Sequence, residues 1–551
     1  MHKNFILIFL VIFFHKTSIS QKIFYSDKGK DEYQLSQNYI IGKVSDNIII
    51  VDHRLPTKKF EILVYDYNMH LKKTISLNSY FPGYLARIDF ANHGDSFDAI
   101  AQYYTSQIFY CKVIRFDGQG HTIQQSVTID SIFAKRSPGD DTTANEIYNI
   151  IQSEDKKQLV MMRAFTGIKS CCLQLDYFYL NDELKTAAKK QFLIPFNKSV
   201  QLSPFYVDNA GNLLFSEFMP EDNTHNLVTF YKIPRDTDAA FNRVQYIDNN
   251  FPSEMAITID NNNHEYLLNG IFFKPIPGGD SLSQPKYAQG IYSSLFAGDL
   301  SVRGKDTLVW LNAIKGLDSF TNHHNFSFNN IVPANGGFYL SFNSHSITGQ
   351  RFQSAPGYTG STTGQPDFDA FRTVPAALGS PYKESVGTNT YTNPMIIQPG
   401  TGDPGADIER PWVDFPNPYD KNRKLVKVEN EKSDRSGQMP VILYLNSNNE
   451  VQWLRAFDTN TDNNIVSFKK ISSGIIAQNM HFVFSHTVHN DKKITGEIAI
   501  SPDGKYKMKN MISSDALYDI QAEKGVQVDE RSVVFPCKAR FRLAFVRIEF
   551  D

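Results

Sequence analysis

The feature that most constrains this chain is a phrase that recurs along it. Each copy has a strand rich in aromatic and β-branched residues, then a turn of Asp, Asn or Gly, then a return strand, which is typical of an antiparallel hairpin. Seven copies are visible: ILVYDYNMHLKKTISL from Ile62, CKVIRFDGQGHTIQQSVTI from Cys111, LDYFYLNDELKTAAKKQFLI from Leu175, LVTFYKIPRDTDAAFNRVQYI from Leu227, IYSSLFAGDLSVRGKDTLVWL from Ile291, VILYLNSNNEVQWLRAF from Val441 and GEIAISPDGKYKMKNM from Gly496.

The spacing of the copies gives the size of the repeat. The turns near Asp66, Asp117, Asn181 and Pro234 lie 51, 64 and 53 residues apart. Two shorter strands precede each copy, as YIIGKVSDNIIIVD precedes the first. A unit of this length therefore predicts a four-stranded antiparallel sheet with its loops, repeated around an all-β body.

In this repeat pattern the chain resembles the β-propeller superfamily, in which four-stranded blades stand around a central channel. The resemblance rests on periodicity over nearly all of the chain, because the sequence has no repeated WD dipeptides, no kelch double-glycine pattern and no series of sialidase Asp boxes. One stretch, Ser501-Pro502-Asp503-Gly504-Lys505, looks like the SPDGK turn of TolB-type propellers. The resemblance implies a single propeller over residues 21–551.

The two ends of the chain indicate how such a ring closes. Residues 517–522, 531–537 and 540–550 read as three strands of a last blade that lacks a fourth. QKIFYSD, from Gln21, is one short amphipathic strand before the first full blade. We expect this N-terminal strand to pair with the three C-terminal strands, because an open third strand would leave an aggregation-prone edge. The expected count is eight blades, with seven as the alternative.

Residues 1–20 are set aside from the fold. His2 and Lys3 precede an apolar run from Phe5 to Phe14 and the small-residue pattern Ser18-Ile19-Ser20, which is typical of a secretory signal peptide. We expect export to the periplasm, the outer surface or the medium, and no membrane span, because no other apolar run approaches eighteen residues.

Charge and cysteine content narrow the range of partners. Fifty-six basic and 58 acidic residues give a net charge of −2, which provides no basic face for nucleic acid. The four cysteines are Cys111, Cys171, Cys172 and Cys537, and none of them forms a CxxC motif. A bridge from Cys111 to the adjacent pair is one option, and small buried hydrophobic residues are the other. No cofactor and no metal are expected.

The repeats differ most at two places on one predicted face. About 90 residues, 344–437, are inserted between the second and third strands of the sixth blade, and a smaller insertion, Lys274 to Gln289, has the same place in the fifth. The large insertion is rich in Gly, Ser, Thr and Pro, so it is either a flexible surface loop or a lid or docking arm. In the second case its aromatic residues would bind sugar or protein: Tyr358, Phe368, Phe371, Tyr382, Tyr391 and Trp412.

Local catalytic motifs are weak. Ser380-Pro381-Tyr382-Lys383 matches SxxK without the companion motifs of serine acylases, and Asp458 to Asp462 resembles a calcium loop without its glycine. His323 and His324 precede an expected inner strand and would lie near the channel mouth, as a binding pair or in a structural role.

Three functions fit these patterns. The first is an exported binding or scaffold module that engages protein or glycan through its loop-decorated face. The second is a polysaccharide-acting enzyme, whose paired acids would come from separate blades and leave no local motif. The third is a structural subunit of a cell-envelope assembly.

Overall fold

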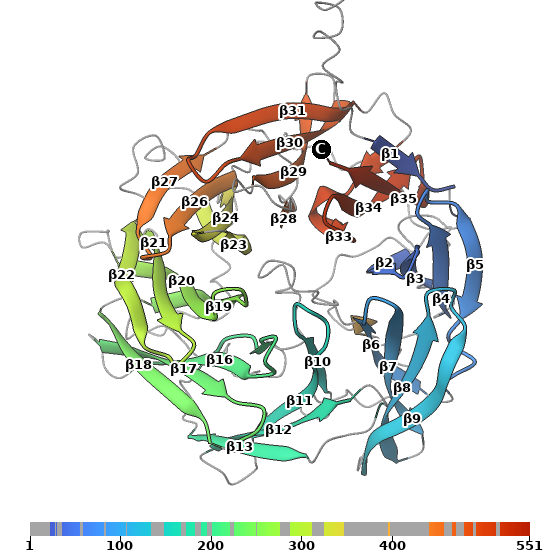
Figure 1. Ribbon diagram of the computed structural model, residues 1–551, viewed down its shortest axis with the longest axis horizontal. Coiled ribbons are helices and arrows are strands. Elements are labelled where there is room, and N and C mark those ends of the chain that lie inside the picture. Colours follow the sequence, from blue (N-terminus) through green and yellow to red (C-terminus); the bar gives the residue numbers. More distant parts are fainter. Residues whose placement is uncertain are drawn as a thin grey trace, which may run out of the picture.

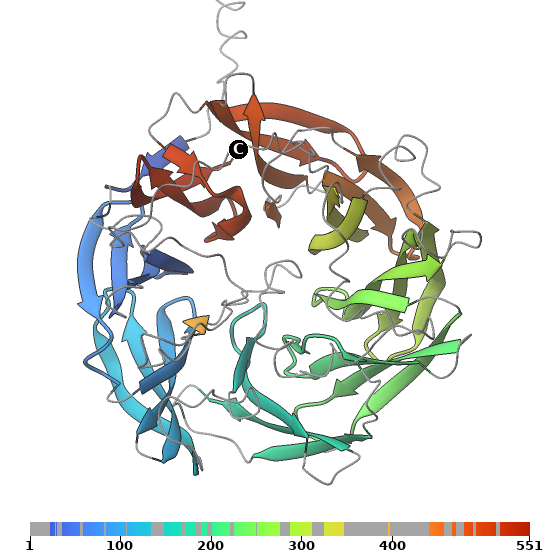
Figure 2. The same ribbon diagram turned by 180° about the vertical axis from the view of Figure 1, so that it is seen from behind.

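The computed structural model confirms an eight-bladed β-propeller, with the sheets arranged in one ring (Figures 1 and 2). The structure describes residues 22–27, 29, 36–54, 59–81, 84–105, 107–133, 148–166, 172–181, 184, 189–195, 201–220, 225–237, 239–248, 251–275, 287–310, 324–334, 336–346, 395–396, 440–456, 466–469, 479–488, 492–513 and 518–550.

Each of the first four blades runs from an inner to an outer strand. Blade 1 has β2 (Ser36–Val44), β3 (Asn47–Arg54), β4 (Lys59–Asp66) and β5 (Leu71–Ser76), and blade 2 has β6 (Tyr84–Asn92), β7 (Ser96–Thr105), β8 (Ile108–Asp117) and β9 (Thr122–Phe133). Blade 3 has β10 (Asn149–Gln152), β11 (Leu159–Thr166), β12 (Cys172–Leu180) and β13 (Lys190–Pro195). In blade 4 the inner strand is split into β14 (Gln201–Leu202) and β15 (Tyr206–Val207), followed by β16 (Leu213–Pro220), β17 (His225–Ile233) and β18 (Phe241–Asp248).

The other four blades keep the same order. Blade 5 has β19 (Phe251–Asp260), β20 (Glu265–Pro275), β21 (Tyr287–Ala297) and β22 (Val302–Trp310), and blade 6 has β23 (His324–Ala334), β24 (Gly337–Ser346), β26 (Pro440–Asn446) and β27 (Val451–Ala456). Blade 7 has β28 (Val466–Lys469), β29 (Met480–Val488), β30 (Lys492–Ile500) and β31 (Tyr506–Ser513). Blade 8 combines β32 (Tyr518–Ile520), β33 (Val526–Gln527), β34 (Ser532–Ala539) and β35 (Arg542–Glu549) with β1 (Lys22–Tyr25).

Burial follows the position of a strand in its blade. The second strand β3, NIIIVDHR, is buried at every residue except Arg54, whereas the outer strand β5, LKKTIS, is exposed at every residue except Ile75. The core lies between blades, where facing sheets interdigitate. Tyr39 of blade 1 packs on Phe90 of blade 2, for example, with 5.5 Å between their ring centroids.

The predicted closure is confirmed. β1 pairs antiparallel with β35, from Lys22 opposite Glu549 to Tyr25 opposite Val546, and supplies the outer strand of blade 8 (Figure 1). Ser26 continues the contact, since its backbone N–H donates to the carbonyl of Phe545. Ile23, Phe24 and Tyr25 are only half-buried, because an outer strand has solvent on one side.

A buried arginine holds this closure together. Arg547 of β35 is 1% exposed, and its guanidinium lies 4.1 Å from the ring centroid of Phe24 and 3.7 Å from that of Tyr67. It also donates to the hydroxyl of Ser532. The side chain thus joins the N-terminal strand, the C-terminal strand and the first outer turn.

Five outer hairpin turns, in blades 1, 2, 5, 6 and 7, share one backbone conformation. In each, the first residue donates its N–H to the carbonyl of the fifth, and the fourth donates to the first. SPDGK, from Ser501 to Lys505, is therefore one case of a turn that DYNMH and DGQGH also form. The fourth residue always has a positive φ: Met69 (68°), Gly120 (71°), Leu300 (65°), Asn449 (61°) and Gly504 (77°).

This fourth residue docks into the preceding blade. Met69 packs with Phe545 of blade 8, and Leu300 packs with Phe230 of blade 4. Gly504 lies against the indole of Trp453, which donates its ring N–H to the carbonyl of Pro502 at 2.8 Å. The turn conformation is thus a device that links blades, as well as a way to reverse the chain.

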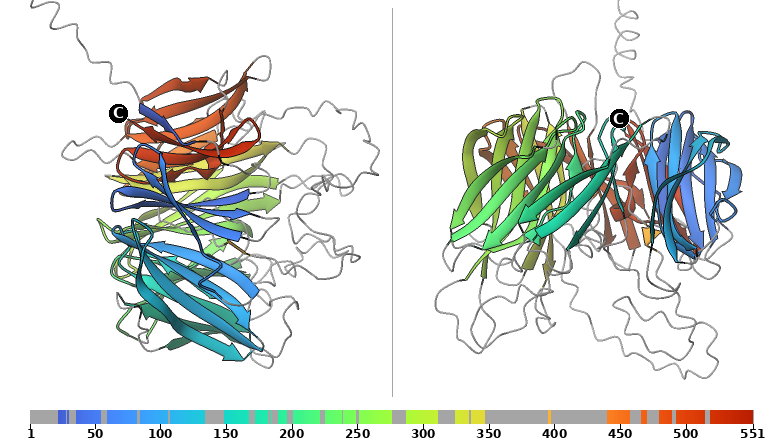
Figure 3. Two further views of the ribbon diagram at one scale, coloured as in Figure 1. Left: turned by 90° about the vertical axis from the view of Figure 1, so that its right-hand side faces the viewer. Right: turned by 90° about the horizontal axis from the view of Figure 1, so that it is seen from below.

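The strands cross the ring between its two faces (Figure 3). One side of the ring holds the turns between the first and second strands of each blade and the outer hairpin turns, and we call it the turn face. The opposite side holds the connections between the second and third strands and the connections from blade to blade, and we call it the loop face. The connections from Pro275 to Tyr287 and from Ser346 to Pro440 belong to the loop face.

Two smaller points concern the described residues. The thiols of Cys111 and Cys537 are buried and free, as the small-hydrophobe interpretation of Cys111 predicts, and burial raises the pKa of both. In the part of the chain that the structure describes, no helix has the length and apolar character needed to cross a membrane.

Candidate functional site

Most of the binding residues predicted from sequence lie outside the described residues. These are Tyr358, Phe368, Phe371, Tyr382, Tyr391, Trp412 and His323, together with the SxxK stretch and the calcium-like loop. His324 is the first residue of β23, and its backbone pairs with that of Ser346, the last residue of β24, from which the long connection to β26 starts. The structure therefore places the start of the inner strand of blade 6 beside the root of the insertion.

One described piece of the insertion lies far from that root. β25 (Met395–Ile396) pairs antiparallel with β6, with Met395 opposite Ile88 and Ile396 opposite Arg87, and is the short gold arrow beside β6 in Figure 1. β6 is the inner strand of blade 2. The insertion of blade 6 therefore adds a strand to the channel-side edge of blade 2.

A buried charge pair lies on β6 at the same level. The guanidinium of Arg87 binds the carboxylate of Asp89 through two bonds of 2.8 and 3.1 Å, and a third bond of 2.9 Å reaches Asn149 of blade 3. Burial raises the pKa of Asp89, and Arg87 only partly offsets this. Gln102 bonds both the backbone N–H and the carbonyl of Tyr148, so this group joins two neighbouring blades near the channel.

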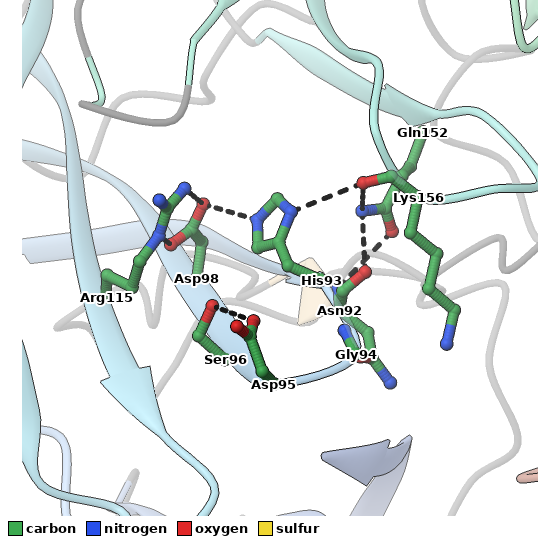
Figure 4. Close-up of polar contacts among 9 residues, drawn as sticks. All are labelled: Asn92, His93, Gly94, Asp95, Ser96, Asp98, Arg115, Gln152 and Lys156. Carbon is green, nitrogen blue, oxygen red and sulfur yellow. Dashed lines mark hydrogen bonds and ion pairs between the residues drawn. The ribbon is translucent and has the colours of Figure 1, made fainter. Parts of the chain in front are cut away.

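A second buried group stands at the turn-face end of β6 (Figure 4). The carboxylate of Asp98 is fully buried and accepts two bonds from Arg115, at 2.7 and 2.9 Å, while Nε2 of His93 lies 2.8 Å from it. Burial alone would raise the pKa of Asp98, but the bonds from Arg115 and His93 outweigh it and hold that pKa below its usual range.

The histidine of this group is fully engaged. Its Nε2 faces Asp98, and its Nδ1 lies 3.3 Å from the carbonyl oxygen of Lys156 in blade 3. Both ring nitrogens of His93 are thus occupied by contacts within the protein. The His93–Asp98–Arg115 group therefore links the turns of blades 2 and 3.

Similar bonds continue around the turn face. The backbone N–H of Asp155 donates to the side chain of Asn209, whose own N–H donates to the side chain of Asn261. Asn261 in turn reaches back to Glu154 at 2.8 Å. On the other side, Ser45 of blade 1 donates its N–H to the carbonyl of Gly94. Hydrogen bonds thus join the described inner turns of blades 1 to 5 into one arc.

The buried carboxylates test the idea of paired catalytic acids. Among the described residues, all nine have a protein partner: Asp52 with Ser36, Asp89 with Arg87, Asp98 with Arg115, Asp176 with Arg163, Asp208 with Asn212, Glu217 with Tyr231, Asp260 with Asn263, Glu265 with Arg303 and Glu497 with His481. Within the same described residues there is no group of three or more potential metal ligands. Each of these nine acids is therefore occupied by a contact within the protein.

Sequence reasoning missed both buried groups. The signal for the first was present, since LARIDFA puts Arg87 and Asp89 two residues apart in an apolar strand and hence on one side of it. The second had no usable signal. His93, Asp98 and Arg115 lie on three different segments, and only the fold of blade 2 brings them together.

No protein-family model and no curated protein matches this chain. Among solved structures it is similar to the WD40 domain of SCAP from fission yeast, at 10% identity over 96% of this chain and 98% of that one, with a TM-score of 0.38. An ulvan lyase of polysaccharide lyase family PL25 matches at 7% identity over 95% of each chain, with a TM-score of 0.39. A prolyl endopeptidase matches at 7% identity and a TM-score of 0.37, over 93% of this chain but only 55% of its own length. Likeness at this level says nothing about what the chain does.

Proposed function

We propose that this chain is an exported binding module that engages protein or glycan through the loop face of its propeller. The observation that carries the proposal is the unequal use of the two faces. On the turn face, the described inner turns of blades 1 to 5 are short and bond one another, whereas the long connection from Ser346 to Pro440 leaves the ring on the loop face. Long connections of this kind commonly carry the ligand contacts of a rigid scaffold.

The sequence of the insertion supports the same role. It places Tyr358, Phe368, Phe371, Tyr382, Tyr391 and Trp412 among small polar residues, and aromatic side chains are the usual stacking surfaces for sugars and anchors for proteins. The signal-peptide pattern of residues 1–20 supports export, where glycans and envelope proteins are the available partners.

The rival activity, cleavage of a polysaccharide, lacks a supporting observation in the described chain. Such an enzyme needs a proton donor and a second carboxylate within about 5–10 Å, facing a sugar. Glu217 has a pKa raised by burial, as a proton donor would, but its carboxylate accepts a bond from the hydroxyl of Tyr231 at 2.7 Å. The binding function is therefore the better supported of the two.

The test replaces residues 347–439 with a four-residue Gly-Ser-Asn-Gly turn. β24 and β26 already pair as a regular hairpin from Gly337 opposite Asn446 to Asn343 opposite Pro440, so the shortened chain keeps its ladder. Mature wild type and the shortened variant are used to capture partners from a cell-envelope extract, and both are applied to a glycan array. The matched control replaces residues 277–285 in the corresponding connection of blade 5.

The expected result is a partner or glycan that binds wild type and the control but not the shortened variant. Loss of a protein partner with no glycan signal assigns a protein ligand, and the converse assigns a glycan. If wild type and the shortened variant retain the same partners and the same glycans, the insertion is not the binding arm and the proposal fails.

A further inference from the structure

The outer edges of the blades differ in one respect that bears on association. In a propeller each outer strand presents unpaired N–H and C=O groups, and proteins protect such edges with basic side chains, prolines or bulges. Seven of the eight outer strands carry a Lys or Arg: Lys22 in β1, Lys72 and Lys73 in β5, Lys190 in β13, Arg243 in β18, Arg303 and Lys305 in β22, Arg455 in β27, and Lys507 and Lys509 in β31.

β9 of blade 2 is the exception. Its sequence, TIQQSVTIDSIF, has no basic residue, and at 12 residues it is the longest of the outer strands. It lies at the end of the strand order of its sheet, so no described strand covers its outer edge (Figure 1). Its only charged side chain, Asp130, is already bound by Lys189 at 3.2 Å and by the hydroxyl of Tyr148.

The strand also exposes apolar side chains at both of its ends. Ile123 is 57% exposed and Phe133 is 65% exposed, which exceeds every other large apolar residue on a described strand. Polar residues lie between them, from Gln124 to Ser126. The strand therefore presents one exposed apolar side chain near each end of an edge that carries no basic residue.

From these observations we infer that β9 is a self-association edge, at which two copies of this chain pair β9 with β9 about a two-fold axis. A two-fold contact is self-complementary by symmetry, and β9 meets its copy without opposing like charges, because Asp130 is neutralised within its own chain. The exposed Phe133 of each copy would pack on the β9 edge of its partner. The basic residues of the other seven edges would repel their own copies.

Register irregularities in the β8–β9 ladder limit where the pairing can be regular. The ladder shifts near Arg115 and between Cys111 and Lys112, whereas Asp130 to Phe133 pair without interruption with Cys111 to Ile108. Bulges bend an edge away from a partner. We therefore place the contact mainly on the second half of β9, where Phe133 lies.

The test measures the mass of the mature chain by sedimentation velocity between 1 and 100 μM. Wild type should move from one to two chains across this range. Ser131→Lys, which puts a cation on an exposed position in the second half of β9, should leave a single chain even at 100 μM. The matched control, Thr74→Lys on the exposed outer strand β5, should associate as wild type does.

A folding defect is excluded by requiring equal melting temperatures for the two variants. A second variant, Phe133→Ser, removes the apolar contact without adding charge and should raise the dissociation constant at least tenfold. A wild type that stays a single chain at 100 μM overturns the inference. So does a dimer that Ser131→Lys leaves intact, which would place the contact elsewhere, and so does equal weakening by Thr74→Lys.

Discussion

On the turn face a few residues make each reversal of the chain and also bond the next blade, whereas on the loop face one connection alone runs from Ser346 to Pro440. Asn449 illustrates the first case. It turns the backbone with φ 61°, and its buried amide donates to the carbonyls of Ser293 and Lys305 in blade 5. A substitution of Asn449 would therefore disturb both the turn and the contact with blade 5. The longest connection between described strands belongs to the loop face, and connecting segments tolerate changes of length better than the strands that they join.

The largest expected effect concerns the ring on which both faces depend. Removing residues 21–27 deletes β1, uncovers the edge of β35 and strips Phe24 from the guanidinium of Arg547. We expect a loss on the order of 5 kcal/mol in the free energy of unfolding, from three half-buried apolar side chains and the cation–π contact, together with oligomers formed through the open edge. Thermal unfolding with sedimentation measures both, and an unchanged melting temperature would show that β1 does not close the ring.

The next effect tests a single buried group of the turn face. Asp98→Asn leaves the guanidinium of Arg115 without its counter-charge, which should cost about 4 kcal/mol at pH 7 by denaturant unfolding. Asp95→Asn, on an exposed residue of the same turn, should cost less than about 0.5 kcal/mol. Equal losses in the two variants would mean that the His93–Asp98–Arg115 group does not link the blades.

The same group should also show in the dependence of stability on pH. The pKa of Asp98 is lower in the folded chain than in the unfolded chain, so its stabilising contribution is complete above the unfolded pKa of about 4 and is lost as the pH falls through the folded value. Unfolding free energies from pH 6 to pH 2 should therefore fall less steeply in Asp98→Asn than in wild type. Parallel curves would show that Asp98 titrates alike in both states.

Asn449 gives a smaller effect with an internal control. Asn449→Ala leaves the two carbonyls and the hydroxyl of Ser293 without their partner and puts alanine at a positive φ, which should cost about 3 kcal/mol. Asn448→Ala, at the exposed neighbour in the same turn, should cost less than about 0.5 kcal/mol. Chemical unfolding measures both variants, and a mild Asn449→Ala would argue that the outer turns reverse the chain without linking blades.

Substitutions at two glycines distinguish the cost of backbone strain from the cost of losing the contact with a neighbouring blade. Both Gly94 and Gly504 have a positive φ, at 89° and 77°, but an added Cβ would meet nothing at Gly94, whereas at Gly504 it would lie 3.0 Å from the indole of Trp453. Gly94→Ala should cost about 1 kcal/mol from strain alone, and Gly504→Ala about 2 kcal/mol, with a change in tryptophan fluorescence. Equal costs would show that the indole of Trp453 can move away from the added Cβ without a loss of stability.

The sequence predicts the fold better than it predicts the contacts between turns and neighbouring blades. The repeat can be predicted from local sequence patterns. The eight-blade count and the β1–β35 pairing can be predicted from two strands without partners, QKIFYSD from Gln21 and the last strand, residues 540–550. The turns are harder, because Met69 and Leu300 adopt a positive φ without being glycine or asparagine. Their conformation is stabilised by the blade into which they insert, which no local rule contains.

Contacts between distant segments escape sequence reasoning altogether. Arg547 lies between Phe24 and Tyr67, each more than 470 residues away in the chain, and an arginine in an amphipathic strand reads as exposed. The binding residues predicted from the insertion are untested for a different reason. Tyr358 and its companions were chosen by composition, which indicates what a segment can bind but not how its side chains converge, and they remain predictions.

The smallest expected effect on stability belongs to the largest change in the chain. Replacing residues 347–439 with a four-residue turn removes β25 from β6 but leaves every blade with its four strands. Shortening a loop lowers the entropic cost of closing it by about 0.6 kcal/mol for each halving of its length, so we expect a melting temperature equal to or above that of wild type. A fall in the unfolding free energy comparable to that of Asn449→Ala would mean that the pairing of β25 with β6 stabilises blade 2. The loop face would then resemble the turn face in kind, and the contrast between them would be one of length only.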